Sequence, residues 1–146
     1  MIKLCLSLAD SSVAVLEEKI ARYAGQVPYI EARLDYLSEP EVPAVPDGLG
    51  TDFIATCRPV REGGNYQGEE RARLQLLERA SRSGFTWVDL EHDVEEALSL
   101  PAQARILRSQ HCFERFPEDL AALFDSLKQA GGDMFKMALS ISTTRE

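Results

Sequence analysis

Short apolar runs alternate with amphipathic segments along the chain. We expect strands at 2–8, 29–37, 53–60, 86–91, 105–113 and 134–141, where apolar residues form runs of strand length between turn signals. Helical spacing of apolar residues predicts helices at 11–24, 68–83 and 117–130, with a weaker one at 95–100. The segment 38–50 contains three prolines and is typical of an extended loop. This alternation predicts a single α/β domain over 1–146, with a parallel sheet and right-handed crossovers.

The predicted helices have recognisable ends. Serines at 11 and 12 suit the N-cap of the first helix, and Gly84 closes the second. The third begins with Pro117 in its first turn and ends at Gly131 and Gly132. Alternation alone is compatible with a flavodoxin-like open sheet and with a (β/α)₈ barrel.

Polar residues share one face of most predicted strands, and this favours the barrel. In "YIEARLDYL", Glu31, Arg33 and Asp35 alternate with apolar residues. The same alternation groups Cys5 with Ser7, Thr56 with Arg58, Asp89 with Glu91, and Ser109 with His111. A single strand of this kind suits the edge of a sheet, but most strands of one sheet cannot be edges. A doubly wound sheet is covered by helices on both faces and would be apolar on both, whereas a barrel can line its mouth with charged groups.

Composition excludes several classes of protein. The formal net charge of −8 argues against a general nucleic-acid binder. No apolar run approaches the roughly 18 residues of a membrane helix, and the N-terminus lacks the features of a signal peptide. Cys5, Cys57 and Cys112 are widely spaced and form no CxxC motif, which favours a reducing compartment over disulfides or a zinc site. We therefore expect a cytoplasmic protein with no metal site and no membrane association.

A lysine interrupts the last apolar run, "GGDMFKMALSIS". Lys136 and His111 lie on consecutive predicted strands, which a parallel sheet would make neighbours. Apolar surroundings disfavour the ammonium form of a lysine, and a free amine can attack a carbonyl to form a Schiff base. A nearby histidine could then move the proton on the carbon next to the imine. The plainer alternative is a lysine that pairs with a buried carboxylate, namely Glu31, Asp89 or Glu91.

Five motifs occur in a characteristic order: "EARLDYL", "TCRPVREGG", "VDLE", "SQHCF" and "FKMA". Each is weak alone, but together the chain resembles the type I 3-dehydroquinate dehydratases, the Schiff-base lyases of the shikimate pathway. The resemblance implies a fold of the (β/α)₈ TIM-barrel family. It also implies dehydration of 3-dehydroquinate to 3-dehydroshikimate, in aromatic amino acid biosynthesis, without a cofactor.

The resemblance assigns roles by position. Lys136 would form the imine, His111 would transfer protons, and Glu62 would assist His111. The residues implied in substrate binding are Glu31, Arg33, Arg58 and Ser7. Structural alternatives are an Arg58–Glu62 pair and a Glu31–Arg33 ion-pair ladder. Gln110 and Cys112 depart from the motif around His111, which has an aromatic residue and Asp or Asn at these positions.

The predicted strands number about six, whereas a barrel of this kind has eight strands in about 250 residues. We therefore expect an incomplete barrel. The resemblance implies that the groups gripping the substrate carboxylate lie on the seventh and eighth strands, so we expect little or no dehydratase activity from this chain alone. Two explanations stay open: a piece of a longer dehydratase, or a short form that closes its open sheet edges as a homodimer or with another chain. Two other functions also stay open, a class I aldolase or transaldolase-like barrel and a non-catalytic fragment that serves as an assembly module.

Overall fold

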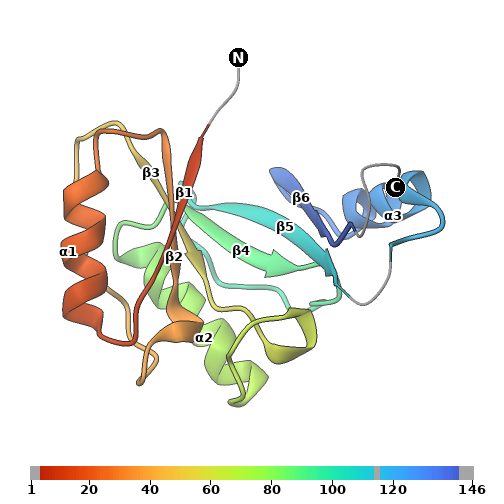
Figure 1. The fold of residues 1–146 in the computed structure, drawn as a ribbon, viewed down its shortest axis with the longest axis horizontal. Helices are drawn as coiled ribbons and strands as arrows, with labels where there is room; N and C mark the ends of the chain where they lie inside the picture. The colour runs from red at the N-terminus through yellow and green to blue at the C-terminus, as the bar shows by residue number, and fades with distance from the viewer. Residues whose placement is uncertain (1–3, 114–115, 142–146) are drawn as a thin grey trace.

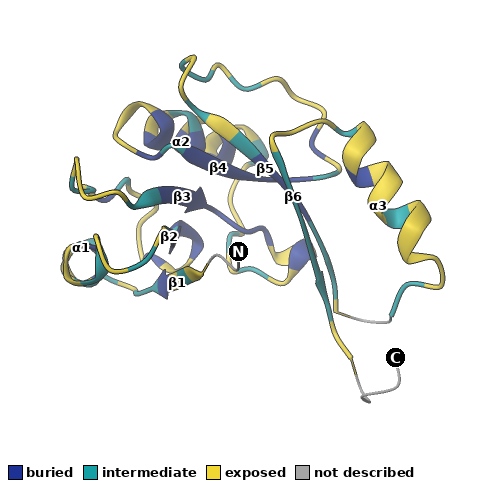
Figure 2. Ribbon diagram, turned by 90° about the horizontal axis from the view of Figure 1, so that it is seen from above, coloured by how far each residue is buried: buried dark blue, intermediate teal, exposed yellow. Residues whose placement is uncertain are grey.

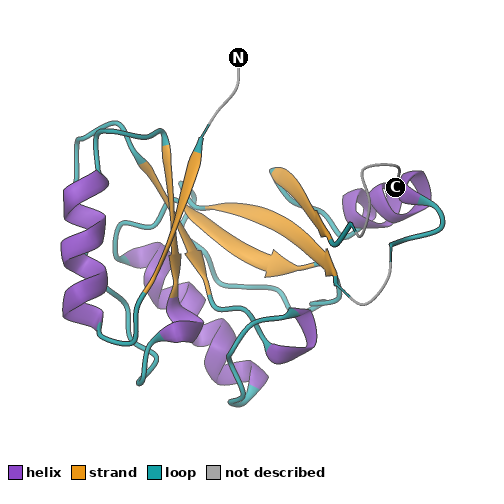
Figure 3. Ribbon diagram, in the orientation of Figure 1, coloured by secondary structure: helices purple, strands orange, loops and turns teal. Residues whose placement is uncertain are grey.

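The computed structural model describes residues 4–113 and 116–141, which form one curved sheet with helices on its outer side (Figure 1, Figure 3). The strands are β1 (Cys5–Ala9), β2 (Tyr29–Arg33), β3 (Asp52–Thr56), β4 (Trp87–Glu91), β5 (Arg105–Cys112) and β6 (Met134–Leu139). The helices are α1 (Val13–Tyr23), α2 (Glu70–Arg82) and α3 (Leu120–Gln129), with 3₁₀ turns η1 (Leu34–Tyr36) and η2 (Val60–Glu62). All six strands are parallel and follow one another in chain order, which confirms the predicted half-barrel.

The helices lie on the convex side of the arc (Figure 2). α1 packs on β1 and β2, α2 on β3 and β4, and α3 on β5 and β6. Leu16, Ile20 and Leu77 are fully buried against Ile30 and Val88, because the apolar stripes of α1 and α2 face the outer side of the strands. The core thins toward α3, where Leu127 is the one buried residue of the helix. No helix among the described residues is long and apolar enough to cross a membrane.

Two predicted strands, at 29–37 and 53–60, end well before the expected residue. β2 ends at Arg33, and Asp35 lies in η1, where its carboxylate accepts from Arg33 and from the backbone N–H of Asn65. These contacts draw the chain out of the strand ladder. β3 ends at Thr56, because Pro59 has no N–H to donate and the chain then turns through η2. The first predicted strand begins at Cys5 in the structure, and its positions 2 and 3 lie outside the described residues.

Two helix predictions were also wrong in part. Residues 95–100 are not helical, because the backbone N–H of Ser99 donates to the Glu78 carboxylate at 2.6 Å and holds this segment along α2. α3 begins at Leu120 rather than at Pro117. Asp119 is its N-cap and accepts from the backbone N–H of Ala122 at 2.9 Å, which makes it a better helix start than a proline two residues earlier.

Two glycines explain the turn after β3. Gly63 has φ +75°, a left-handed conformation that favours glycine. A Cβ on Gly64 would lie only 2.1 Å from the backbone oxygen of Arg58, so no other residue fits there without a backbone shift. The turn therefore folds tightly under the end of β3, and it places Glu62 of η2 beside the end of β5.

The sheet has two free edges within the described part of the chain. β1 pairs with β2 alone, and β6 pairs with β5 alone. The concave face of the arc is thus open on one side. Glu31, Asp89 and Lys136 lie on this concave face, where their side chains meet.

Candidate active site

Lys136 of β6 reaches across the inside of the arc. Its Nζ lies 3.3 Å from Oε1 of Glu31 on β2 and 3.4 Å from Oδ2 of Asp89 on β4. Neither strand neighbours β6, so the contacts require the curvature of a barrel. The side chain is 35% exposed, which leaves the amine between two buried carboxylates and solvent. The pairing that the plainer alternative described is present with Glu31 and Asp89, and the amine of Lys136 is still accessible to solvent.

Glu31 is held ionised by its neighbours. Burial alone would raise its pKa, but Lys136 and hydrogen bonds from the Ser7 and Thr56 hydroxyls lower it, and the net pKa of Glu31 is below its ordinary value. Thr56 donates to Oε1 at 2.8 Å. Glu31 therefore presents a fixed negative charge to the lysine.

Arg58 forms the centre of a buried ion cluster. Its Nη1 donates to Oε1 of Glu91 at 2.6 Å and to Oγ of Ser109 at 2.8 Å. Its Nη2 lies 2.6 Å from Oδ2 of Asp89 without the alignment of a hydrogen bond. Ser109 in turn donates to Asp89 at 2.5 Å. Four polar groups, from β4, from β5 and from the segment that follows β3, thus fix one another next to the Asp89 carboxylate that faces Lys136.

The electrostatics of the two clustered carboxylates differ. Burial would raise the pKa of Asp89, but Arg58, Lys136 and the Ser109 hydrogen bond lower it, and the net pKa is below its ordinary value. Burial raises the pKa of Glu91 above its ordinary value, despite the opposing effect of Arg73 and Arg58. The lowered pKa of Asp89 favours its ionised form beside Lys136. The arginines next to Glu91 oppose the rise in its pKa.

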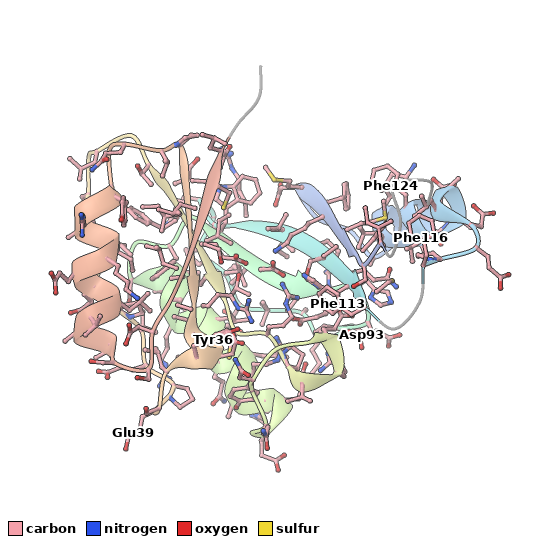
Figure 4. The ribbon with its side chains drawn as sticks, in the orientation of Figure 1. Tyr36, Glu39, Asp93, Phe113, Phe116 and Phe124 are labelled. Atoms are coloured by element: carbon pink, nitrogen blue, oxygen red, sulfur yellow. The ribbon has the colours of Figure 1, made fainter. Side chains whose placement is uncertain are left out.

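His111 and Glu62 form a second group at the end of β5. Oε2 of Glu62 accepts from the His111 backbone N–H at 2.8 Å and lies 2.9 Å from Nδ1 of the ring. A proton on Nδ1 would donate to this carboxylate, which leaves Nε2 with a lone pair. Phe113, labelled in Figure 4, follows β5. Its ring lies near the His111 imidazole, with ring centroids 5.7 Å apart. The carboxylate and the phenyl ring together fix the orientation of the base.

The structure brings most of the predicted site residues into contact with one another. Ser7, Glu31, Arg58 and Lys136 belong to one connected cluster, and His111 pairs with Glu62 on the strand next to Lys136. Arg33 stands apart from this cluster, because it bonds to Asp35 at 2.8 and 2.9 Å and lies over the Tyr36 ring. The alternative pairs, Arg58 with Glu62 and Glu31 with Arg33, are replaced by these contacts.

One group of residues has the composition of a metal site. Ligand atoms of Glu62, His92 and Asp93 lie within 4.8 Å of one another. Asp93, however, is held by Arg61 through contacts of 2.9 and 3.1 Å, and Glu62 already bonds to His111. A cation there would have to displace an arginine, so this group has the character of an ion-pair network.

Sequence reasoning missed Arg73. This arginine lies on the buried face of α2 and reaches Glu91 at 2.8 Å. Its burial could have been inferred from its spacing in the sequence. Arg73 precedes Leu77 by four residues and so falls on the apolar stripe of the helix. A charged residue on such a stripe needs a buried partner.

The chain is similar in sequence to curated 3-dehydroquinate dehydratases. A 3-dehydroquinate dehydratase from Desulfotalea psychrophila is 31% identical over 154 residues, covering 99% of this chain and 67% of the relative. One from Methanopyrus kandleri is 37% identical over 109 residues, covering 70% of this chain and 50% of the relative. The chain therefore spans about half to two thirds of the length of these curated relatives.

Solved structures give the same fold. The type I 3-dehydroquinate dehydratase from Clostridium difficile superposes with a TM-score of 0.75 at 15% identity, covering 98% of this chain and 64% of that one. The 3-dehydroquinate dehydratase from Enterococcus faecalis superposes with a TM-score of 0.68 at 18% identity, covering 94% of this chain and 65% of that one. The family model for type I 3-dehydroquinase matches residues 4–146, and this chain belongs to that family.

Proposed function

We propose that this chain carries the imine-forming part of a 3-dehydroquinate dehydratase site. The observation that carries the proposal is the placement of Lys136. Its amine is partly exposed on the concave face, between Glu31 and Asp89, and its strand neighbours the one that bears the His111–Glu62 pair. The order of the motifs and the family membership support the same substrate.

The chemistry follows from these groups. His111 first takes a proton from the Lys136 ammonium, and the free amine then attacks the substrate ketone. His111 returns the proton to the hydroxyl of the adduct, which leaves as water and gives a protonated imine. The imine draws electrons from the adjacent carbon, so Nε2 of His111 can remove a proton there. The same imidazolium then gives a proton to the hydroxyl on the next carbon, which leaves as water. Hydrolysis of the conjugated imine releases the enone product and restores the amine.

The remaining groups hold the reactants in place. Glu62 orients His111 and stabilises its protonated form, while Glu31, Arg33 and Ser7 are the groups proposed to bind substrate hydroxyls. Arg58 is only 2% exposed, and its guanidinium contacts strand side chains. We therefore assign it to holding Asp89 and Ser109, and a direct contact between Arg58 and substrate stays a prediction.

The proposal predicts slow dehydration of 3-dehydroquinate that depends on His111. The chain should convert 3-dehydroquinate to a product with the ultraviolet absorbance of a conjugated enone, at a rate limited by weak substrate binding. His111→Asn should lower that rate by about 10² to 10⁴-fold, the range for loss of a general acid–base group. His92→Asn is the matched control, because His92 is the other histidine of the chain and lies 3.7 Å from Glu62. Equal rates for the native chain and His111→Asn would contradict the proposed role.

We also propose that the chain functions in the cytoplasm and associates with a second copy through its free edges. Its cysteines Cys5, Cys57 and Cys112 are free thiols, as a reducing compartment favours. Leu4 and Ile141, beside β1 and β6, are 65% and 62% exposed, and an unpaired strand edge with apolar neighbours favours pairing. Sedimentation of the purified chain should show a dimer that dissociates on dilution. A monomer at every concentration would contradict this association.

A further inference from the structure

A fully buried arginine lies on the convex side of the sheet, which the helices cover. Arg73, on α2, has no exposed surface. Its Nε and Nη2 bond to the Glu70 carboxylate at 2.9 and 2.7 Å, and its Nη1 donates to the backbone oxygen of Cys57 at 2.9 Å. The same Nη1 lies 2.8 Å from Oε2 of Glu91. One guanidinium thus ties the start of α2 to the residue after β3 and to the last residue of β4.

Glu91 is shared by two arginines. Arg73 approaches Oε2 from the helix side, and Arg58 donates to Oε1 from the interior of the arc at 2.6 Å. Burial raises the pKa of Glu91, and the charges of Arg73 and Arg58 both oppose that rise. Arg58 then reaches Asp89, whose Oδ2 also faces the amine of Lys136 at 3.4 Å.

We propose that Arg73 is a positioning residue for the imine site. It acts through Glu91 on Arg58, and through Arg58 on the carboxylate of Asp89 that faces Lys136. The inference rests on the proposed function, because it assigns a part in the attack of the lysine to a residue that touches no reacting atom.

The contacts of Arg58 explain how Arg73 can affect the placement of Lys136 without touching it. All described partners of the Arg58 guanidinium are side chains of β4 and β5. Without Arg73, Glu91 loses its outer cation and either takes up a proton or turns its carboxylate. Arg58 then loses one of its two 2.6 Å contacts and is free to shift, together with Asp89. The amine of Lys136 would lose its fixed partner, and a misplaced nucleophile attacks more slowly.

The first test needs no substrate. In the native chain, the nitrogen-15 signals of the Arg58 guanidinium should be resolved and in slow rotation, because both terminal nitrogens are held. Arg73→Met should average these signals, and Arg73→Gln provides the same comparison if the methionine variant does not fold. Leu77→Ala is the matched control, since it removes a fully buried side chain from the same helix without touching the ion cluster. Unchanged Arg58 signals in a folded Arg73→Met chain would overturn the inference.

The second test measures covalent capture of 3-dehydroquinate by Lys136 under borohydride. Arg73→Met should slow capture by about fivefold, within the effect expected along a connected side-chain network, while Leu77→Ala should not. Arg73→Lys keeps the charge but loses the paired contacts to Glu70, so it should recover capture only in part, to a rate between those of Arg73→Met and the native chain. In the Glu91→Gln background the further effect of Arg73→Met should be under about twofold, because the two residues act in one chain of contacts. Full additivity of Arg73→Met and Glu91→Gln would contradict the assignment.

The two proposals can fail separately. If the native chain is not captured at all, the proposed function is wrong, and the Arg58 signals alone decide whether Arg73 positions the cluster. If the native chain is captured and Arg73→Met is captured equally fast, the proposed function stands and the role of Arg73 is refuted.

Discussion

Lys136→Met is expected to lower both dehydration and covalent capture of 3-dehydroquinate by about 10³-fold or more, because no other group can replace the amine that forms the imine. The variant should still fold. Glu31 keeps its bond from Thr56, and Asp89 keeps Arg58 and Ser109, so neither buried carboxylate is left without a partner. Enone absorbance and intact mass after borohydride reduction measure the two losses.

Lys128→Met is the control for this prediction. Lys128 lies on α3 with its side chain about half exposed and pairs with Asp125 on the helix surface. Its loss should leave capture unchanged. If Lys136→Met were captured as fast as the native chain, the imine would form on another amine and the site described for β6 would be wrong.

Arg58→Met is expected to cost about 3–5 kcal/mol of unfolding free energy, the range for breaking a buried ion pair from one side. The variant leaves Asp89 without its strongest counter-charge and Glu91 with Arg73 alone. Urea denaturation monitored by circular dichroism measures the change. Arg61→Met is the control, since Arg61 and its partner Asp93 are both substantially exposed and such pairs contribute about 1 kcal/mol or less.

The loss of unfolding free energy caused by Arg58→Met should depend on pH. The pKa of Asp89 is depressed in the folded chain, so its ionised form stabilises the fold above its ordinary pKa of 3.8. That stabilisation is lost as the pH falls through the lower folded value. The difference in stability between the native chain and Arg58→Met should therefore be large near neutral pH and shrink on acidification. A loss of under about 1 kcal/mol at neutral pH, similar to that of Arg61→Met, would show that the cluster does not support the sheet.

Alternation along the chain was enough to predict the parallel sheet and the charged interior. The placement of Glu31 and Asp89 opposite apolar neighbours is a local property of each strand, so it can be read from sequence. Their meeting with Lys136 needed one more step, the inference that the sheet curves. The His111–Glu62 pair was implied only by family resemblance, because Glu62 lies in a turn where spacing carries no direction.

Other features depend on contacts between distant segments. The segment around Ser99 looked helical, but its backbone is held by Glu78 on another element. Asp35 leaves the strand because Asn65, thirty residues later, donates to it. Arg73 seemed to be one more charge on an amphipathic helix, and only the fold shows that Glu91 lies beneath it. The pattern of apolar and polar residues within one element does not show its contacts with distant segments, so the conformations and contacts of these residues could not be predicted from it.

Peptide mapping of the captured chain identifies the lysine that forms the imine. The native chain is incubated with 3-dehydroquinate, reduced with borohydride and digested, and the modified lysine is identified by mass spectrometry. We expect a single secondary-amine adduct on Lys136, with Lys19 and Lys128 unmodified. An adduct spread over the surface lysines, or none on Lys136 in a folded chain at saturating substrate, would contradict it.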